Sequence, residues 1–269
     1  KDKADLKKLF GDCGAAADAT VDFGSVQGVN MMFNGDLDGF AWGGSSCAPL
    51  EGRTNFCTRV TWNPPWSFNN LSPLAHEMGH GYGLPHSNNS DGDDDTYDNP
   101  WDVMSDGWSN AVRDATYGAR PKHINIFQRH RLSWVNAARQ LVIPYGNTAT
   151  RQVDLDFAHL PGSVNTQMLV LSLSPQPDPY ATVVYTLEAR KPEGAYEGAL
   201  AGPAVILHKL ERSGTAYSID ADTPAANTSN NEGSMFKVGE RWVTPDGSHA
   251  IRVDAVTATG FRLTVGLGA

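Results

Sequence analysis

The chain has 269 residues, 40 % of them hydrophobic, and it carries a formal net charge of −9 with a pI near 5.3. A chain of this length and composition can bury a sizeable core, as one large domain or as two. The acidic balance argues against nucleic acid and against an anionic membrane surface as partners. Apolar runs such as "AVILHKL" have the length of a strand and are too short to span a membrane.

Three cysteines are present, Cys13, Cys47 and Cys57, which is too few for a disulfide-based scaffold. Cys47 and Cys57 flank a short loop and form the favoured pair, although three pairings are open and each leaves one thiol over. The N-terminal "KDKADLKKLF" has no signal-peptide core and fits a mature chain after processing. Together with few lysines and many Asn, Gly, Ser and Thr residues, this predicts a secreted protein.

The first part of the chain alternates helix and strand signals. Residues 3–18 carry apolar residues along one helical face, and residues 28–33 form a short apolar run that predicts a buried strand followed by a turn. The glycines of residues 39–46 predict an edge strand, and residues 58–64 predict another strand. Residues 72–83 predict a helix with Ser72 as N-cap, Pro73 at the first helical position and Gly83 as terminator.

The pattern changes near residue 140. Residues 121–140 predict a second helix, whereas the remainder shows short alternating segments separated by turns and no helix between them. These predicted strands are residues 151–157, 167–174, 182–190, 204–211, 250–256 and 260–267. We therefore expect an α/β domain over residues 1–140 and an antiparallel β-sandwich domain over residues 141–269.

The stretch "HEMGHGYGLPH" carries the chemistry. His76 and His80 are four residues apart, so on a helix both project from one face and can bind one Zn²⁺. Glu77 follows His76 directly and lies where the general base for a zinc-bound water belongs. Gly83 ends the helix and turns the chain, so that Leu84 and Pro85 return His86 as a third ligand.

Three histidines leave one coordination position for water, which is typical of a catalytic zinc site rather than a structural one. The stretch resembles the zinc motif of the metzincin clan of metalloproteases at every defined position, and Met104 in "DVMSDG" resembles the Met-turn of that clan. This resemblance implies a domain with a twisted sheet, a zinc-binding helix, a Met-turn and a C-terminal helix, with the Met104 thioether beneath the three histidines.

Later segments, "INIFQRHRLSWV", "YTLEARKP" and "FKVGERWVTPDG", are similar to the gametolysin and immune-inhibitor-A types of secreted metalloprotease. Two features depart from the clan. Asp106 stands where some members place a tyrosine ligand, so no tyrosine ligand is expected. The residues ahead of His76 begin with a helix, whereas a complete upper lobe usually begins with a strand.

The acidic segment "DGDDDTYDN" follows the third histidine. Asp91, Asp93, Asp95 and Asp98 are candidate calcium ligands, because Ca²⁺ takes six to eight oxygens; the alternative is a solvated acidic loop. The five remaining histidines lack ligand spacing and are expected to be structural or surface residues. They are His123, His130, His159, His208 and His249.

These features predict a secreted, monomeric zinc endopeptidase in which His76, His80 and His86 bind the metal and Glu77 is the catalytic base. Its partners would be protein or peptide substrates, held extended along the predicted edge strand of residues 39–46. The alternative is a glycan- or protein-binding module with a residual zinc site. An intact Glu77 argues against that alternative, because a site without catalysis has no use for the base.

Overall fold

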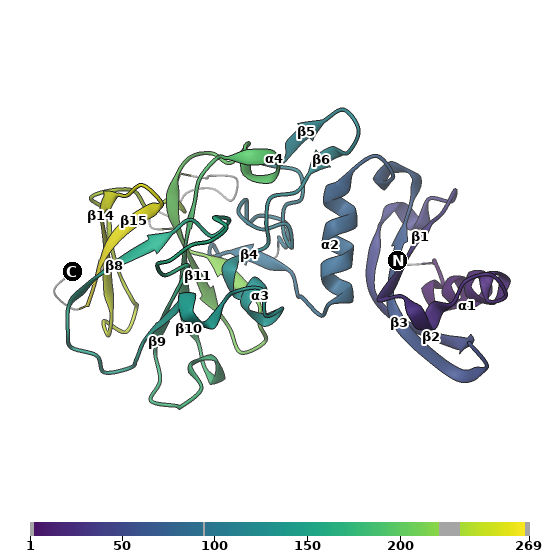
Figure 1. Cartoon of the computed structure of the whole chain (residues 1–269), viewed down its shortest axis with the longest axis horizontal. Helices are drawn as coiled ribbons and strands as arrows, with labels where there is room; N and C mark the ends of the chain where they lie inside the picture. The colour runs from purple at the N-terminus through teal and green to yellow at the C-terminus, as the bar shows by residue number, and fades with distance from the viewer. Residues whose placement is uncertain (1–2, 94, 221–231, 267–269) are drawn as a thin grey trace. The chain divides into compact units, whose positions relative to one another are not determined.

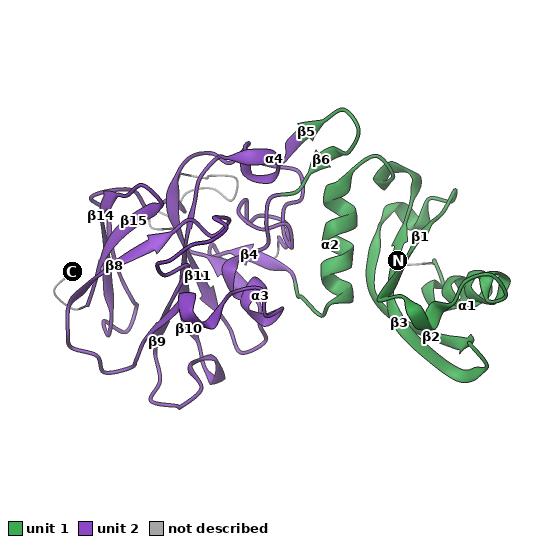
Figure 2. Ribbon diagram, viewed as in Figure 1, with its two compact units in different colours: residues 1–85, 113–121 green, residues 86–112, 122–269 purple. Residues whose placement is uncertain are grey.

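The computed structural model of the chain describes residues 3–93, 95–220 and 232–266. Over these residues the fold is mixed α/β, with four α-helices and several sheets. It divides into two compact units, unit 1 with residues 1–85 and 113–121, and unit 2 with residues 86–112 and 122–269 (Figure 2). The predicted domain boundary after residue 140 falls inside unit 2, because one strand from residues before 140, β4 (Ser87–Asn89), joins the larger sheet of that unit.

Unit 1 is built on a three-stranded sheet in the order β1-β3-β2, in which β3 runs parallel to β1 and antiparallel to β2. Residues 113–121 belong to the same unit and include most of a small two-stranded ribbon, β5 and β6. The elements are α1 (Leu6–Ala17), β1 (Gly28–Met32), β2 (Trp42–Leu50), β3 (Arg53–Asn63), α2 (Leu71–Gly81), β5 (Val112–Asp114) and β6 (Gly118–Arg120).

The sheet of unit 1 lies between its two helices, α1 on one face and α2 on the other (Figure 1). On the α1 side, Phe10 of the helix packs with Val60 and Trp62 of β3 in one buried cluster. Side chains alternate between the faces of a strand, so Thr61 of β3 points to the other side, toward α2. Helix α2, which carries the zinc-ligand motif, therefore packs on a sheet whose opposite face is covered by α1.

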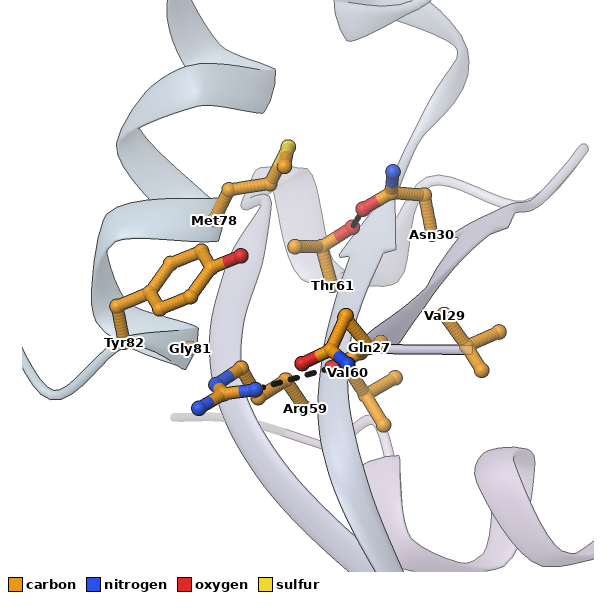
Figure 3. A pocket seen from close by; sticks show the side chains of 10 residues that line it. Gln27, Val29, Asn30, Arg59, Val60, Thr61, Met78, Gly81 and Tyr82 are labelled. Carbon is orange, nitrogen blue, oxygen red and sulfur yellow. Dashed lines mark hydrogen bonds between the residues drawn. The ribbon is translucent and has the colours of Figure 1, made fainter. Parts of the chain in front are cut away.

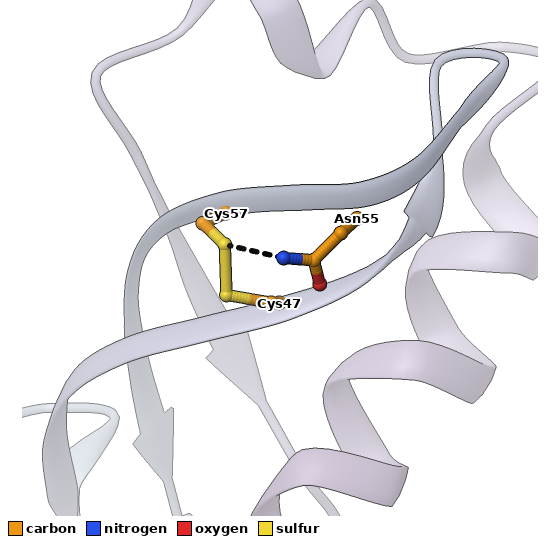
Figure 4. Close-up of a disulfide and its surroundings, with 3 residues drawn as sticks. All are labelled: Cys47, Asn55 and Cys57. Atoms are coloured by element: carbon orange, nitrogen blue, oxygen red, sulfur yellow. Dashed lines mark hydrogen bonds between the residues drawn. A yellow bond between two sulfur atoms is a disulfide. The ribbon is translucent and has the colours of Figure 1, made fainter.

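Cys47 and Cys57 form a disulfide between directly opposed residues of β2 and β3, with a Cα–Cα distance of 4.0 Å (Figure 4). This confirms the favoured pairing, and Cys13 is the free, exposed thiol. The bridge ties the β2–β3 hairpin together, and such a crosslink stabilises mainly by restricting the unfolded chain. A disulfide is consistent with a secreted protein.

Two predictions for unit 1 need correction. The strand at β1 is confirmed, but its predicted burial is wrong, since exposed and half-buried residues alternate along it at an edge of the sheet. Helix α2 has Asn70 rather than Ser72 as its N-cap, so Pro73 lies two positions further into the first turn than predicted. Proline is tolerated there because the first N–H groups of a helix have no partner within the helix.

Unit 2 contains a six-stranded sheet, β4-β12-β11-β10-β9-β7, and a four-stranded sheet, β13-β14-β15-β8. The elements are β4 (Ser87–Asn89), α3 (Ile126–Arg131), β7 (Gln140–Ile143), β8 (Arg151–Asp156), β9 (Met168–Ser172), β10 (Val184–Arg190), α4 (Gly194–Glu197), β11 (Ala204–Leu210), β12 (Ala216–Ser218), β13 (Arg241–Val243), β14 (Ala250–Val256) and β15 (Gly260–Val265). Among the described residues no helix has the length and apolarity needed to cross a membrane.

One hydrophobic cluster fills the space between the two sheets of unit 2. It joins Leu169, Leu187 and Leu207 of the larger sheet to Val253 and Leu263 of the smaller one, all fully buried. The apolar side chains of the strands predicted in the second half of the chain thus line the inner faces of both sheets. The strands predicted in the second half of the chain are present, whereas the short strands β4, β7, β12 and β13 were not predicted.

The predicted helix over residues 121–140 is wrong for most of its length. Only α3 (Ile126–Arg131) is α-helical, capped by the Asn125 side chain, which accepts from the Gln128 N–H at 3.0 Å. Ser133 adopts a left-handed conformation (φ 61°) that ends the helix early. Residues after it form a short 3-10 turn (Ala137–Arg139) and then β7, because pairing with β9 overrides the helical pattern.

Candidate metal centre

His76 and His80 project from the same face of α2, as their spacing predicts. Their rings meet edge to face with centroids 4.7 Å apart, and their Nε2 atoms lie 3.1 Å from each other. Two Nε2 atoms bound to one tetrahedral Zn²⁺ at 2.0–2.1 Å would lie about 3.3 Å apart. The separation in the structure therefore suits two ligands of a single ion.

The end of α2 has the hydrogen bonds of a Schellman cap. Gly83 has a φ of 79° and its N–H donates to the His80 carbonyl at 2.9 Å, while the Leu84 N–H donates to the Gly79 carbonyl at 3.0 Å. The left-handed conformation suits glycine because an L side chain there would be strained. This confirms Gly83 as the residue that ends the helix and redirects the chain toward His86.

The same turn holds the imidazole of His80. Its Nδ1 lies 2.8 Å from the Leu84 carbonyl oxygen, which can only accept, so the hydrogen bond places the proton on Nδ1 and leaves the Nε2 lone pair for a metal. Burial lowers the pKa of His80, and a bond to the Leu84 carbonyl opposes this. The neutral ring that a metal ligand requires is therefore favoured at neutral pH.

His86 completes the group, since ligand atoms of His76, His80 and His86 all lie within 4.8 Å of one another. The His86 ring also packs edge to face on the ring of Tyr97, with centroids 5.2 Å apart. Three imidazole nitrogens in this arrangement fit a borderline-soft ion such as Zn²⁺ and leave one tetrahedral position for water or substrate. The three residues singled out by the sequence can therefore hold one metal ion.

Glu77 is 8 % exposed, in contrast to the usual solvent exposure of glutamate. Burial raises its pKa to about 7. A carboxyl group with a pKa near neutrality can both take up and release a proton under physiological conditions, which suits a general acid–base group. Its position beside His76 on α2 follows from the sequence, whereas its burial could not be predicted.

Gly43 of β2 makes a close backbone contact with α2 that the sequence analysis did not identify. A Cβ atom at this residue would lie 1.9 Å from the carbonyl oxygen of Glu77, so the strand and α2 touch through their backbones. The neighbouring Gly44 has open space where its Cβ would be. The glycine-rich strand predicted at residues 39–46 is confirmed as an edge strand, and Gly43 sets how closely it approaches the helix.

A small cavity of about 170 Å³ lies between α2 and the β1–β3 edge of the sheet (Figure 3). Met78 and Tyr82 of α2 line it, and the Arg59 guanidinium lies over the Tyr82 ring at 4.6 Å. Met78 and Tyr82 are each two residues from a ligand histidine and so project from the opposite face of the helix. This cavity is therefore separate from the metal centre.

Two further predicted features lie in unit 2. Met104 is fully buried, and its carbonyl accepts from the Ser87 N–H at 3.1 Å. In the acidic segment, carboxylate oxygens of Asp91, Asp93 and Asp98 lie within 4.8 Å of one another. Asp95 is not part of that group, and its carboxylate accepts from the Tyr97 N–H at 2.9 Å. The five histidines without ligand spacing join no metal-ligating group among the described residues.

No protein-family model, curated protein or solved structure matches the chain.

Proposed function

We propose that this protein is a secreted zinc-dependent endopeptidase of the metzincin type. The observation that carries the proposal is the convergence of His76, His80 and His86, whose ligand atoms lie within 4.8 Å of one another beside the buried Glu77. Histidine clusters with a neighbouring buried glutamate and an open coordination position are typical of catalytic rather than structural zinc.

A bound Zn²⁺ would lower the pKa of its water toward about 7 and polarise the carbonyl of the peptide bond to be cleaved. Glu77 takes the proton from the attacking water and then donates it to the nitrogen of the leaving amine. Its low exposure keeps bulk water from competing for that proton. Burial lowers the pKa of His80 and so favours its neutral ring, while the Leu84 carbonyl accepts from Nδ1 and keeps the proton on that nitrogen.

Strand β2 is the proposed binding site of the peptide substrate. It lies at the edge of the three-stranded sheet, with β3 as its one neighbour among the described strands. An extended peptide can add to such an edge through backbone hydrogen bonds. Because Gly43 contacts the backbone of Glu77, a peptide bound along β2 would pass close to the catalytic base. Cleavage of an extended, unfolded substrate is therefore expected.

The direct test is the Glu77→Gln substitution, assayed on unfolded casein. Glutamine has nearly the same shape but cannot accept the proton, so we expect hydrolysis to fall by about 10²–10⁴-fold while zinc stays bound. Glu211→Gln, the same change at a half-buried residue of unit 2, is the matched control and should keep full activity.

Full activity of Glu77→Gln would reject the role of this residue. A wild-type protein that binds zinc but leaves casein intact, with and without a chelator, would favour the alternative of a binding module with a residual zinc site.

A further inference from the structure

The backbone that follows His86 belongs to the six-stranded sheet of unit 2. Residues Ser87–Asn89 form β4, the edge strand of that sheet, and pair in parallel with β12, Ser87 lying opposite Ala216. Strand β12 in turn pairs with β11, and β11 with β10. The residue after the third metal ligand is therefore anchored by strands from the second half of the chain.

A chain of buried hydrogen bonds provides a second anchor. The Ser87 N–H donates to the Met104 carbonyl at 3.1 Å, and the Met104 N–H donates to Asp102 Oδ1 at 2.8 Å. The other oxygen of Asp102 accepts from the side-chain amide of Asn125. All four residues are fully buried. We call Asn125, Asp102, Met104 and Ser87 the Asp102 chain.

The same segment is also held from strand β10. The guanidinium of Arg190 donates to the Trp101 carbonyl at 3.0 Å, and it is itself fixed by Glu197 at 2.8 Å. The Trp101 indole N–H donates to the Ser234 hydroxyl at 2.7 Å. These bonds hold the backbone next to Asp102. They thereby help to orient the Met104 carbonyl, which accepts from the Ser87 N–H.

We infer that His86 is positioned for metal binding by the Asp102 chain, through buried hydrogen bonds within unit 2. Asp102 and Asn125 are positioning residues, since they act on His86 through Met104 and Ser87. This inference rests on the proposed zinc site. Outer residues that orient a metal ligand typically contribute 10–100-fold in metal affinity.

The amide–carboxylate pair of Asn125 and Asp102 can be broken and rebuilt. Asn125→Asp places two carboxylates face to face, and Asp102→Asn offers one oxygen where Met104 and Asn125 both need an acceptor. The double variant Asp102→Asn/Asn125→Asp exchanges the partners and restores both bonds. It also keeps an oxygen at position 125 for the Gln128 N–H.

A matched control lies elsewhere in unit 2. Asp156 is 1 % exposed, and its Oδ1 accepts from the Asn165 side-chain amide at 3.0 Å. Asn165→Asp therefore makes the same carboxylate contact at a site that does not touch the Asp102 chain.

The experiment measures zinc affinity by competition with a chromophoric chelator, together with the visible spectrum of the Co²⁺-substituted full chain. We expect both single variants of the Asp102 chain to bind zinc about 10–100-fold more weakly and to show an altered Co²⁺ spectrum. The double variant should recover most of the affinity, and Asn165→Asp should leave affinity and spectrum unchanged although it lowers stability. If Asn125→Asp does not fold, Asn125→Ala replaces it, and we again expect weaker zinc binding than in the wild type and in Asn165→Asp.

Three results would overturn the inference. Unchanged zinc affinity in the single variants, with a wild-type protein that binds zinc and cleaves casein, would reject the role of the Asp102 chain alone. An equal loss in Asn165→Asp would show that affinity follows general stability. A wild-type chain that binds no zinc would reject the proposed function and this inference together.

Discussion

The three candidate ligands are held in two different ways. His76 and His80 share one helix, and the bond that orients His80 comes from Leu84, four residues away. The segment that begins at His86 is held instead by Ala216 through the sheet and by Met104 through a buried carbonyl. Two ligands therefore depend on local structure and the third on tertiary packing, so mutations far from the site should act mainly through His86.

The largest effect in unit 2 is expected from Arg190→Met. Arg190 is fully buried beside Glu188 and Glu197, and its removal leaves the ionised Glu197 carboxylate buried without its cation. Breaking a buried ion pair in this way costs about 3–5 kcal/mol of unfolding free energy. Urea unfolding measures the loss.

Arg262→Met is the control for this substitution. Arg262 pairs with Asp154 at 2.7 Å, but both side chains are substantially exposed, so its loss should have little effect on the free energy of unfolding. Equal costs for the two arginine substitutions would contradict the account of the buried cluster.

A smaller effect, confined to unit 1, is expected from Gly43→Ala. The new methyl group would meet the backbone carbonyl of Glu77, which cannot rotate away, so β2 and α2 must separate. Overpacking of this kind typically costs about 1–3 kcal/mol. Casein hydrolysis should fall as well, because Glu77 moves with its helix. Gly44→Ala enters open space and should be neutral in both assays. Equal behaviour of the two variants would reject the contact.

A pH-dependent effect is expected from Glu188. Burial raises its pKa to about 7, against an ordinary value of 4.5, although the Arg190 charge opposes the shift. The folded state thus favours the protonated acid, and this stability is complete below pH 4.5 and lost as the pH rises through 7. Glu188→Gln stays neutral, so relative to wild type it should gain on the order of 1–3 kcal/mol between pH 4.5 and pH 8. A constant difference across this range would be the contrary result.

The smallest effect is expected from calcium. We propose that Asp91, Asp93 and Asp98, whose oxygens lie within 4.8 Å of one another, hold a Ca²⁺ ion that removes their mutual repulsion. With zinc constant, millimolar Ca²⁺ should stabilise by about 1 kcal/mol and raise the unfolding midpoint by about 2–4 °C. Asp91→Asn should abolish the shift, and Asp114→Asn, outside the segment, should retain it. If the wild-type midpoint does not move, the segment is simply solvated.

The difference between local structure and tertiary packing also explains which features the sequence could predict. His76, Glu77 and the turn at Gly83 were predictable because helix spacing and a left-handed glycine are local properties. The short strand β4 could not be predicted, since its three residues "SNN" gain their conformation only by pairing with β12. Burial of Arg190 and the contact at Gly43 were equally hidden, because both depend on residues distant in sequence.

The limits of the helical pattern are clearest at residues 121–140. The apolar spacing there predicted one long helix, yet Gln140–Ile143 is a strand because Leu141 and Ile143 pair with β9 and join the core between the sheets. Periodicity over so short an apolar run does not separate a buried strand from a helix. The partner strand, which decides the outcome, lies further along the chain.

The central claim is most directly tested by titrating metal-free protein with zinc while measuring both bound metal and the hydrolysis of unfolded casein. The account predicts that one zinc ion binds per chain and that hydrolysis rises in proportion to occupancy, reaching its maximum at one equivalent. It also predicts that His86→Ala loses both. Hydrolysis that proceeds fully in the metal-free protein, or a chain that binds no zinc, would contradict it.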